Sequence, residues 1–334
     1  AARPYQLENK DITWESSENS NIAIETRLFN RLTFTVEAYN KTNSGLLYFV
    51  PLSAITGYTG VWKNIGEIEN KGVEISFSPE IIKAKDFQWS MDFNIGFNKN
   101  RVNELYEDKP ITRGNTQIKV GNDMDAFYMY QWYGVNPGNG EPLWEQVLKA
   151  KDGSDSTTVL TNSLSNASLQ FTGHTASPDF TGGLINNISY KNFSLSANIA
   201  FVYGVYKYNS DRQLYDNDGN YDTYNSMNLA EGWSRWRKPG DIATHPKPMP
   251  GGNRDANRPS SRFIEDASYL RLRNVTFSYN LPKKWSAKLK LTDTRFYLSA
   301  DNLYTATKWS GMDPEAVGMY PLAKKVMFGI SLNF

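Results

Sequence analysis

The chain has 334 residues, no cysteine, and 36 Lys and Arg against 35 Asp and Glu. The lack of cysteine excludes disulfides and thiolate chemistry, and the balanced charge gives no electrostatic reason to expect a nucleic-acid partner. Aromatic residues make up 14% of the chain, although its mean hydropathy is -0.56. This combination suits a soluble carbohydrate-binding β-protein. It also suits a transmembrane β-barrel, whose polar inner face offsets its apolar outer face in any average.

Long stretches alternate between apolar and polar residues with a period of two, which places the two kinds of side chain on opposite faces of a β-strand. One apolar face begins at Phe193 and ends ten positions later at Tyr203, a distance of roughly 33 Å along an extended strand. A tilt of about 40° reduces this to roughly 25 Å, the height of the apolar band of a barrel. Strands of soluble sandwiches are shorter, with about 5–6 residues.

The alternation predicts about eleven strands. They are expected near residues 19–28, 32–46, 67–82, 87–100, 123–135, 142–150, 179–190, 193–204, 268–281, 288–302 and 323–334. Short links (29–31, 83–86, 137–141, 191–192 and 282–286) alternate with long ones (47–66, 101–122, 151–178, 205–267 and 303–322). This alternation is typical of an up-and-down transmembrane barrel with tight periplasmic turns and long outer loops, whereas a soluble sandwich has long loops at both ends.

The fold class that follows is all-β, an antiparallel up-and-down transmembrane barrel. Bacterial single-chain barrels have even strand numbers, and an odd number would leave two unpaired strand edges in lipid, where their backbone groups find no partner. We therefore expect residues 1–334 to be a portion of one barrel domain whose remaining strands lie upstream or on another chain.

Short motifs appear in a fixed order along nearly the whole chain. The longest is Ser261-Arg262-Phe263-Ile264-Glu265-Asp266-Ala267-Ser268-Tyr269-Leu270-Arg271-Leu272-Arg273-Asn274-Val275. The others, in chain order, are Leu28-Phe29-Asn30-Arg31-Leu32-Thr33, Asn64-Ile65-Gly66, Asn70-Lys71-Gly72-Val73-Glu74, Ser177-Pro178-Asp179-Phe180, Gly182-Gly183-Leu184, Arg235-Trp236, Pro239-Gly240-Asp241, Asp301-Asn302-Leu303, Gly311-Met312-Asp313-Pro314-Glu315 and Tyr320-Pro321. In this order and spacing they resemble the SusC/RagA-type TonB-dependent outer-membrane transporters of Bacteroidetes.

The resemblance implies a barrel of about 22 strands, with the eleven predicted strands as its second half. It implies that the plug domain, the TonB box and the first half of the barrel are absent from this chain. Members of this family lie in the bacterial outer membrane and work with a SusD-like surface lipoprotein that covers the barrel. They import oligosaccharides or peptides with energy supplied through TonB.

The C-terminal strand carries a second resemblance. Phe328, Ile330 and Leu332 alternate with polar residues and lead to the aromatic last residue, Phe334. This pattern resembles the signal read by the barrel-assembly machinery. Phe334 could also serve only to pack in the lower aromatic girdle of the barrel, and the two roles are compatible.

One loop places oxygen ligands at alternate positions, as a calcium loop does. They are Asp216, Asp218, Asn220 and Asp222. The glycine of this loop is misplaced for an EF-hand, and no bidentate Glu follows at the required distance. We interpret the segment as a solvated acidic turn, with calcium binding as the alternative.

The longest predicted loop, residues 205–267, is a candidate cargo-binding region, because loops of this length without regular structure are usually functional. Aromatic rings stack on sugars and anchor peptides, and arginines hold carboxylates. The candidate residues are Tyr215, Tyr221, Trp233, Arg235 and Trp236. Equally, these side chains could pack the loop on itself or against a lid protein.

We expect no catalytic activity and no cofactor. His174 and His245 fall in long loops outside any recognisable motif, and their spacing builds no catalytic triad. The leading hypothesis is import of a nutrient, oligosaccharide or peptide, across the outer membrane. One alternative is a soluble secreted β-protein that binds carbohydrate, and another is a passive, porin-like barrel subunit.

Overall fold

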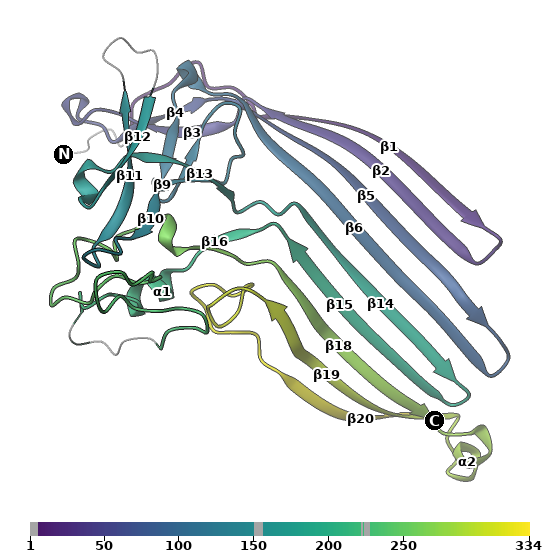
Figure 1. The fold of residues 1–334 in the computed structure, drawn as a ribbon. Coiled ribbons are helices and arrows are strands. Elements are labelled where there is room, and N and C mark those ends of the chain that lie inside the picture. Colours follow the sequence, from purple (N-terminus) through teal and green to yellow (C-terminus); the bar gives the residue numbers. More distant parts are fainter. Residues whose placement is uncertain (1–5, 150–155, 222, 224–227) are drawn as a thin grey trace, which may run out of the picture.

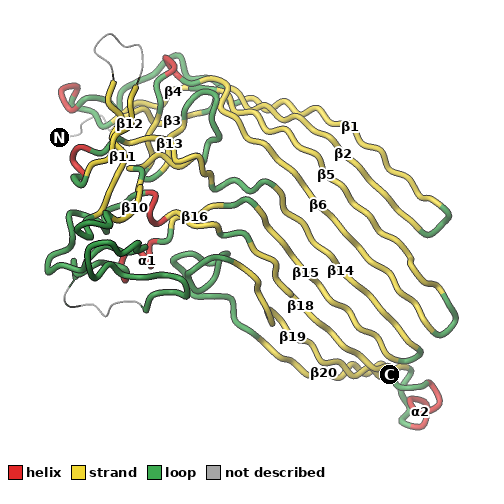
Figure 2. Tube along the Cα trace, viewed as in Figure 1, coloured by secondary structure: helices red, strands yellow, loops and turns green. Residues whose placement is uncertain are grey.

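The computed structural model describes residues 6–149, 156–221, 223 and 228–334. Nine long strands form one curved antiparallel wall in which each strand pairs with its neighbours in the chain (Figures 1 and 2). They are β1 (Ser16–Leu28), β2 (Leu32–Ser44), β5 (Glu67–Lys83), β6 (Phe87–Glu104), β14 (Phe180–Tyr190), β15 (Phe193–Tyr203), β18 (Tyr269–Asn280), β19 (Asp293–Thr307) and β20 (Lys325–Asn333). This order confirms the predicted up-and-down arrangement.

The remaining elements, apart from α2, gather at one end of the wall and make what we call the outer extension (Figure 1). Its strands are β3 (Leu47–Pro51), β4 (Gly60–Asn64), β7 (Ile111–Arg113), β8 (Thr116–Ile118), β9 (Ala126–Tyr130), β10 (Trp132–Val135), β11 (Pro142–Lys149), β12 (Ser156–Thr161), β13 (Leu169–Thr175), β16 (Tyr206–Tyr208) and β17 (Ile264–Asp266). Its helical turns are Ala54–Thr56, Tyr106–Asp108, Leu164–Asn166, α1 (Ser210–Tyr215) and Ser261–Phe263. Helix α2 (Lys283–Lys288) lies at the opposite end.

The links between wall strands alternate in length as predicted. Residues 29–31, 84–86, 191–192 and 281–292 connect strands at one end, and residues 45–66, 105–179, 204–268 and 308–324 connect them at the other. By the rule that periplasmic turns are short and outer loops long, the outer extension lies outside the cell. Among the described residues no helix is long and apolar enough to cross a membrane.

One face of the wall is apolar and bounded by two aromatic rows. Strand register sets five aromatics opposite one another near the short turns: Phe87, Tyr190, Phe193, Tyr279 and Phe296. At the other end, the ring of Phe180 lies 5.7 Å from that of Phe97 and 5.0 Å from that of Tyr203. Two aromatic girdles around an apolar band are the mark of a lipid-facing barrel wall, so this is the outer face.

The opposite face is polar and hydrogen-bonded across strands. The hydroxyls of Ser194 and Ser278 lie 2.7 Å apart, and Ser196 donates to Asn187 at 2.8 Å. Gln88, Asp92, Asn94 and Ser196 all lie on this face. Such a surface is compatible with water and not with acyl chains, so it faces the lumen.

The predicted number of eleven wall strands is wrong by two. Residues 123–135 and 142–150 were expected in the wall, but they form β9, β10 and β11 within small sheets of the outer extension. The link 137–141, expected in the periplasm, joins β10 to β11 on the outside. Phe127 and Met129 are both buried and Trp144 is fully buried. The aromatic side chains of these segments pack on other parts of the outer extension and not on lipid: the Tyr128 ring contacts Phe171 of β13, and the Trp132 ring contacts Trp144.

The wall does not close on itself within the described residues. Strands β1 and β20 are its two edges, and neither has a second neighbour there. Unpaired edge strands are not tolerated in lipid, because their N–H and C=O groups would lack partners. The described wall is therefore part of a larger barrel.

Close approach of side chains across the lumenal face is made possible by glycine. The ring of Tyr39 lies over Gly72 on the neighbouring strand, so that a Cβ at residue 72 would be 2.4 Å from both the ring and the carbonyl oxygen of Phe97. A Cβ at Gly96, on the next strand, would have 3.7 Å to its nearest neighbour, the side chain of Glu74.

We expect Gly72→Ala to destabilise the barrel by about 1–3 kcal/mol, the usual cost of overpacking. The matched control Gly96→Ala adds the same methyl group to the same face without a clash and should change stability by less than about 0.5 kcal/mol. Denaturant unfolding, followed by the heat-dependent electrophoretic mobility of the folded barrel, measures both. Equal midpoints for the two variants would contradict the packing described for Tyr39.

Candidate functional site

The connection between β15 and β18, residues 204–268, holds the candidate cargo residues. Its backbone is anchored by β16, which pairs with β17 at the far end of the same connection. Helix α1 follows β16 because Asn209 caps it: its side chain accepts a hydrogen bond from the backbone N–H of Arg212 at 2.9 Å. Asn and Asp are favoured at this position because they satisfy a free helix N–H.

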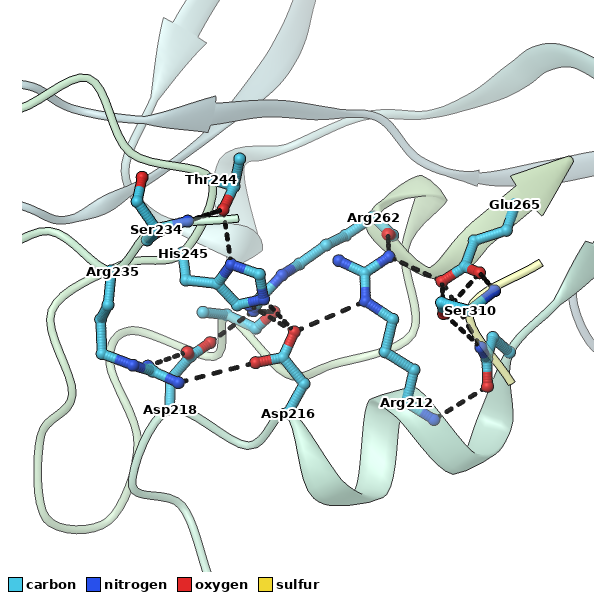
Figure 3. Close-up of polar contacts among 12 residues, drawn as sticks. Arg212, Asp216, Asp218, Ser234, Arg235, Thr244, His245, Arg262, Glu265 and Ser310 are labelled. Atoms are coloured by element: carbon cyan, nitrogen blue, oxygen red, sulfur yellow. Dashed lines mark hydrogen bonds and ion pairs between the residues drawn. The ribbon is translucent and has the colours of Figure 1, made fainter. Parts of the chain in front are cut away.

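Seven charged or titratable side chains form what we call the buried ionic core (Figure 3). They are Arg212, Asp216, Asp218, Arg235, His245, Arg262 and Glu265. Asp218 accepts from Arg235 at 2.6 Å and also from Arg262, and both aspartates are 2% exposed. Arg262 reaches Asp216 as well, at 3.2 Å. The three arginines balance the three carboxylates when His245 is neutral.

Glu265 links two outer loops. It accepts from Arg212 at 2.9 Å and from the backbone N–H of Ser310 at 3.0 Å, and the Ser310 hydroxyl also donates to it. Ser310 belongs to the connection between β19 and β20, residues 308–324, which we call the mouth loop. The mouth loop is held a second time on β18, where Arg271 binds Asp313 at 2.5 Å and Glu315 at 2.9 Å.

The electrostatics of these carboxylates follow from their partners. Burial alone would raise the pKa of Asp216, but the hydrogen bond from His245 and the charge of Arg262 outweigh it, so the pKa lies below its ordinary value of 3.8. In the mouth loop, burial likewise opposes the Arg271 hydrogen bond at Asp313, and the net pKa is lowered. Both aspartates are therefore ionised at neutral pH.

The segment 216–222, predicted to be a solvated acidic turn, is not solvated at its first residues. Asp216 and Asp218 are buried and neutralised by guanidinium groups of the protein itself. Asp222 lies outside the described residues. A calcium ion beside three arginines would be repelled, and the described residues hold no group of acidic and His side chains arranged for a metal.

Three of the five predicted cargo residues make their contacts within the outer extension. Trp236 is buried, and its indole N–H donates to the carbonyl oxygen of Pro137 at 2.9 Å. The guanidinium of Arg212 lies 4.3 Å from the Trp233 ring centre. Arg235 is engaged by both aspartates. Their positions support the alternative interpretation, in which these side chains stabilise the loop.

Tyr215 and Tyr221, the other two candidates, are exposed by 47% and 39%. Tyr215 lines a cleft of about 460 Å³ between α1 and the mouth loop. The opposite wall of the cleft is made by Met312, Met319 and Tyr320, which are 71%, 70% and 90% exposed. Sequence reasoning missed these three residues. The sequence feature that could have pointed to them is that they are large apolar or aromatic side chains in a loop expected to lie in water.

Neither histidine is placed where it could act on a substrate. His245 lies between the Thr244 hydroxyl at 2.7 Å and the Asp216 carboxylate at 2.6 Å, an order that resembles a catalytic triad. However, its side chain is fully buried, so no substrate can reach it. His174 stacks on Tyr206 with ring centres 3.9 Å apart, and burial lowers its pKa.

We expect Asp216→Asn to open the buried ionic core, because it leaves three arginines with only two carboxylates, Asp218 and Glu265. Breaking a buried ionic arrangement by removing one partner costs about 3–5 kcal/mol. Amide hydrogen exchange of residues 209–218 should accelerate while exchange of β14 and β15 stays unchanged. Asp255→Asn, which removes an exposed ion pair with Arg258, is the control and should have no measurable effect.

The same core should be sensitive to acid. Because the folded-state pKa of Asp216 lies below 3.8, its stabilisation is fully present above about pH 4 and is lost as the pH falls through the folded pKa. The rate of amide hydrogen exchange in residues 209–218, corrected for its intrinsic pH dependence, should therefore rise below about pH 4. A flat profile down to pH 2 would contradict the role given to Asp216.

Comparison with known proteins bears on the whole chain. A family model, TonB dependent receptor-like, beta-barrel, matches residues 2–303. TonB-dependent receptor P3 of Formosa agariphila is 29% identical over 98% of the chain, and TonB-dependent receptor SusC of Bacteroides thetaiotaomicron is 27% identical over 98%. The solved RagAB peptide transporter superposes over 98% of the chain with a TM-score of 0.85 and 28% identity.

The chain spans about a third of the length of these proteins: 35% of P3, 32% of SusC and 36% of the RagAB chain. The matches confirm the resemblance, the barrel fold and the outer-membrane location, and they contradict the alternative of a soluble secreted protein. The chain belongs to the TonB-dependent receptor-like β-barrel family.

Proposed function

We propose that this chain supplies nine wall strands and the outer loops of a transporter that imports a nutrient through the outer membrane with energy from TonB. The observation that carries the proposal is the wall itself: a lipid-facing outer side, a polar lumenal side and two open edges. A barrel of about 22 strands would take its other strands, its plug and its TonB contact from outside these residues.

The cleft between α1 and the mouth loop is the part we assign to cargo. Methionine side chains adapt to varied partners, and Tyr215 and Tyr320 add flat rings that bind apolar or sugar surfaces. Asp211 adds a carboxylate at the cleft, whereas Arg212, which also lines it, is buried and paired with Asp216 and Glu265. This mixture favours peptide cargo, in keeping with the relative described as a peptide transporter. An oligosaccharide is the second candidate, since rings at a cleft also stack on sugars.

A surface lipoprotein of the SusD kind is the partner we expect above the outer extension. Ile242 is 93% exposed there, and Tyr320 is 90% exposed. Exposed apolar side chains on an outer surface are suited to a protein lid. Strand β20, with Phe328, Ile330 and Leu332 exposed on the outer face and Phe334 at its end, is the segment we assign to recognition by the barrel-assembly machinery.

We assign no catalytic role and no cofactor to the chain. The arrangement around His245 supports this assignment, because the imidazole is buried among groups that satisfy it. The groups that reach water at the cleft are apolar, aromatic or singly charged and offer no paired acid and base. Import without covalent chemistry requires none.

The test is uptake by cells that carry the complete transporter with Met312, Met319 and Tyr320 each replaced by Ser. Losing apolar contacts worth about 1–2 kcal/mol in total should lower uptake of a limiting peptide mixture about tenfold. Met249→Ser, at an exposed methionine of the outer extension outside the cleft, is the control. Loss of oligosaccharide uptake alone would assign sugar as cargo.

Unchanged uptake of both cargo classes in the triple variant would remove the cleft from the cargo path. An uncoupler of the proton-motive force distinguishes TonB-driven import from the remaining alternative, a passive barrel. Uptake that persists in its presence is that of a passive, porin-like barrel, whereas TonB-driven import stops.

A further inference from the structure

The connection between β18 and β19 differs from every other short turn of the wall. The turns 29–31, 84–86 and 191–192 have two or three residues, whereas residues 281–292 include helix α2. The sequence Leu281-Pro282-Lys283-Lys284-Trp285-Ser286-Ala287-Lys288-Leu289-Lys290 fills most of it. A strand was predicted to start at residue 288, but residues 283–288 are helical. Nothing in the proposed import of cargo explains this element at the periplasmic end.

The turn is fixed to the wall at both ends. The N–H of Leu281 donates to the carbonyl oxygen of Thr294 at 2.8 Å, and the N–H of Thr292 donates to that of Asn333 at 2.7 Å. Helix α2 ends at Lys288. Two residues later, Lys290 has a φ of +60°, the left-handed conformation that closes a helix, and the Leu291 N–H donates to the carbonyl oxygen of Ser286 at 3.0 Å. The element therefore has a defined position next to β19 and β20.

Strand parity shows on which side of the wall α2 lies. Thr294 pairs with Leu332 and shares the outer face with Phe296 and Leu298. Even so, Thr294 is only 2% exposed, and α2 contacts β19. Ser286 on α2 is 1% exposed. The buried Thr294 places α2 against the start of β19 on the lipid-facing side. Thr294 lies two residues before Phe296, which pairs with Tyr279 in the lower aromatic row, and α2 projects from the short-turn end of the wall (Figure 1).

The free surface of α2 combines two chemistries. Trp285 and Leu289 stand four residues apart, on one side of the helical turn, and they are 56% and 61% exposed. Lys283, Lys284, Lys288 and Lys290 surround them, all exposed. Within the part of the chain that the structure describes, none of these four lysines forms an ion pair with a carboxylate. The ammonium of Lys288 lies 4.7 Å from the Trp285 ring centre.

We propose that residues 281–292 are an interfacial anchor that binds the periplasmic leaflet of the outer membrane. Trp285 and Leu289 enter the boundary between headgroups and acyl chains, and the four lysines bind phosphates of anionic phospholipids. Tryptophan concentrates at this boundary, amphipathic basic helices lie in it, and clustered lysines next to a membrane attract anionic headgroups. The position of α2 on the lipid side, at the level of the lower girdle, supplies the geometry.

A protein partner in the periplasm is the competing occupant. The packing of α2 argues for lipid, because a helix laid against the outer face of β19 at the girdle directs its apolar side to the bilayer rim. The inference rests on the membrane placement of the wall and not on the cargo. Its failure would leave the uptake experiment unaffected.

The absence of cysteine from residues 1–334 allows a single label to be placed. Leu289→Cys carries a nitroxide in the complete protein, from which any cysteine outside residues 1–334 has been removed, reconstituted in vesicles of phosphatidylethanolamine and phosphatidylglycerol. Lys85→Cys, in the exposed turn 84–86, is the control. The label at 289 should collide severalfold more with oxygen, relative to a water-soluble nickel chelate, than the label at 85. Equal water accessibility at the two positions would overturn the anchor.

A second comparison tests the lysines. Replacing Lys283, Lys284, Lys288 and Lys290 with Gln should move the label at 289 toward water in anionic vesicles. In phosphatidylcholine vesicles the replacement should make little difference. Heat-dependent electrophoretic mobility confirms that each variant is folded before it is measured. An unchanged label environment in anionic vesicles would overturn the phosphate contact.

Discussion

The interior of a lipid bilayer offers no water, so every backbone N–H and C=O within it must find a partner in the protein. The nine wall strands meet this requirement by pairing with their neighbours in the chain, which leaves β1 and β20 as edges that need strands from elsewhere. The same requirement excludes irregular structure from the wall. All loops that carry buried polar groups, aromatic cores or helices are therefore displaced to its two ends, and cargo contacts can arise only there or in the lumen.

Outside the bilayer the outer extension can bury charge, and it does so to fix geometry. Removing ions from water costs several kcal/mol per ion, so the buried ionic core is poor evidence of a large gain in stability. It is good evidence of position, because Asp216 and Asp218 are satisfied only where Arg262 and Arg235 meet them. Through Glu265 and Ser310 the same network sets the mouth loop against α1. The cleft between them is therefore held open by ion pairs on its buried side.

The wall could be predicted from the sequence because lipid imposes a period of two that nothing local overrides. Strands such as β15 and β20 begin and end within two residues of their predicted limits. The outer extension could not be predicted in the same way, because β9 and β11 also alternate along their length. The sequence does not show whether Phe127, Met129 and Trp144 are buried against protein or face lipid, and the structure buries them against protein. Helix α2 was missed because six residues are too few to show a helical repeat. Trp233 and Trp236 were predicted as candidate cargo residues, but the sequence does not distinguish a ring that packs a loop from one that meets cargo.

The motifs that identified the family therefore hold the outer loops in position more than they form a binding site. Arg235, Arg262 and Glu265 belong to the buried ionic core, and Arg271 with Asp313 fastens the mouth loop to β18. Met312 precedes Asp313 directly, yet its side chain is 71% exposed at the cleft. A substitution at residue 312 would alter the surface of the cleft without removing an ion pair. The side chains that line the cleft can therefore change without loss of the interactions that position the mouth loop. Under the proposed function, cargo preference can change there while the outer loops keep their arrangement.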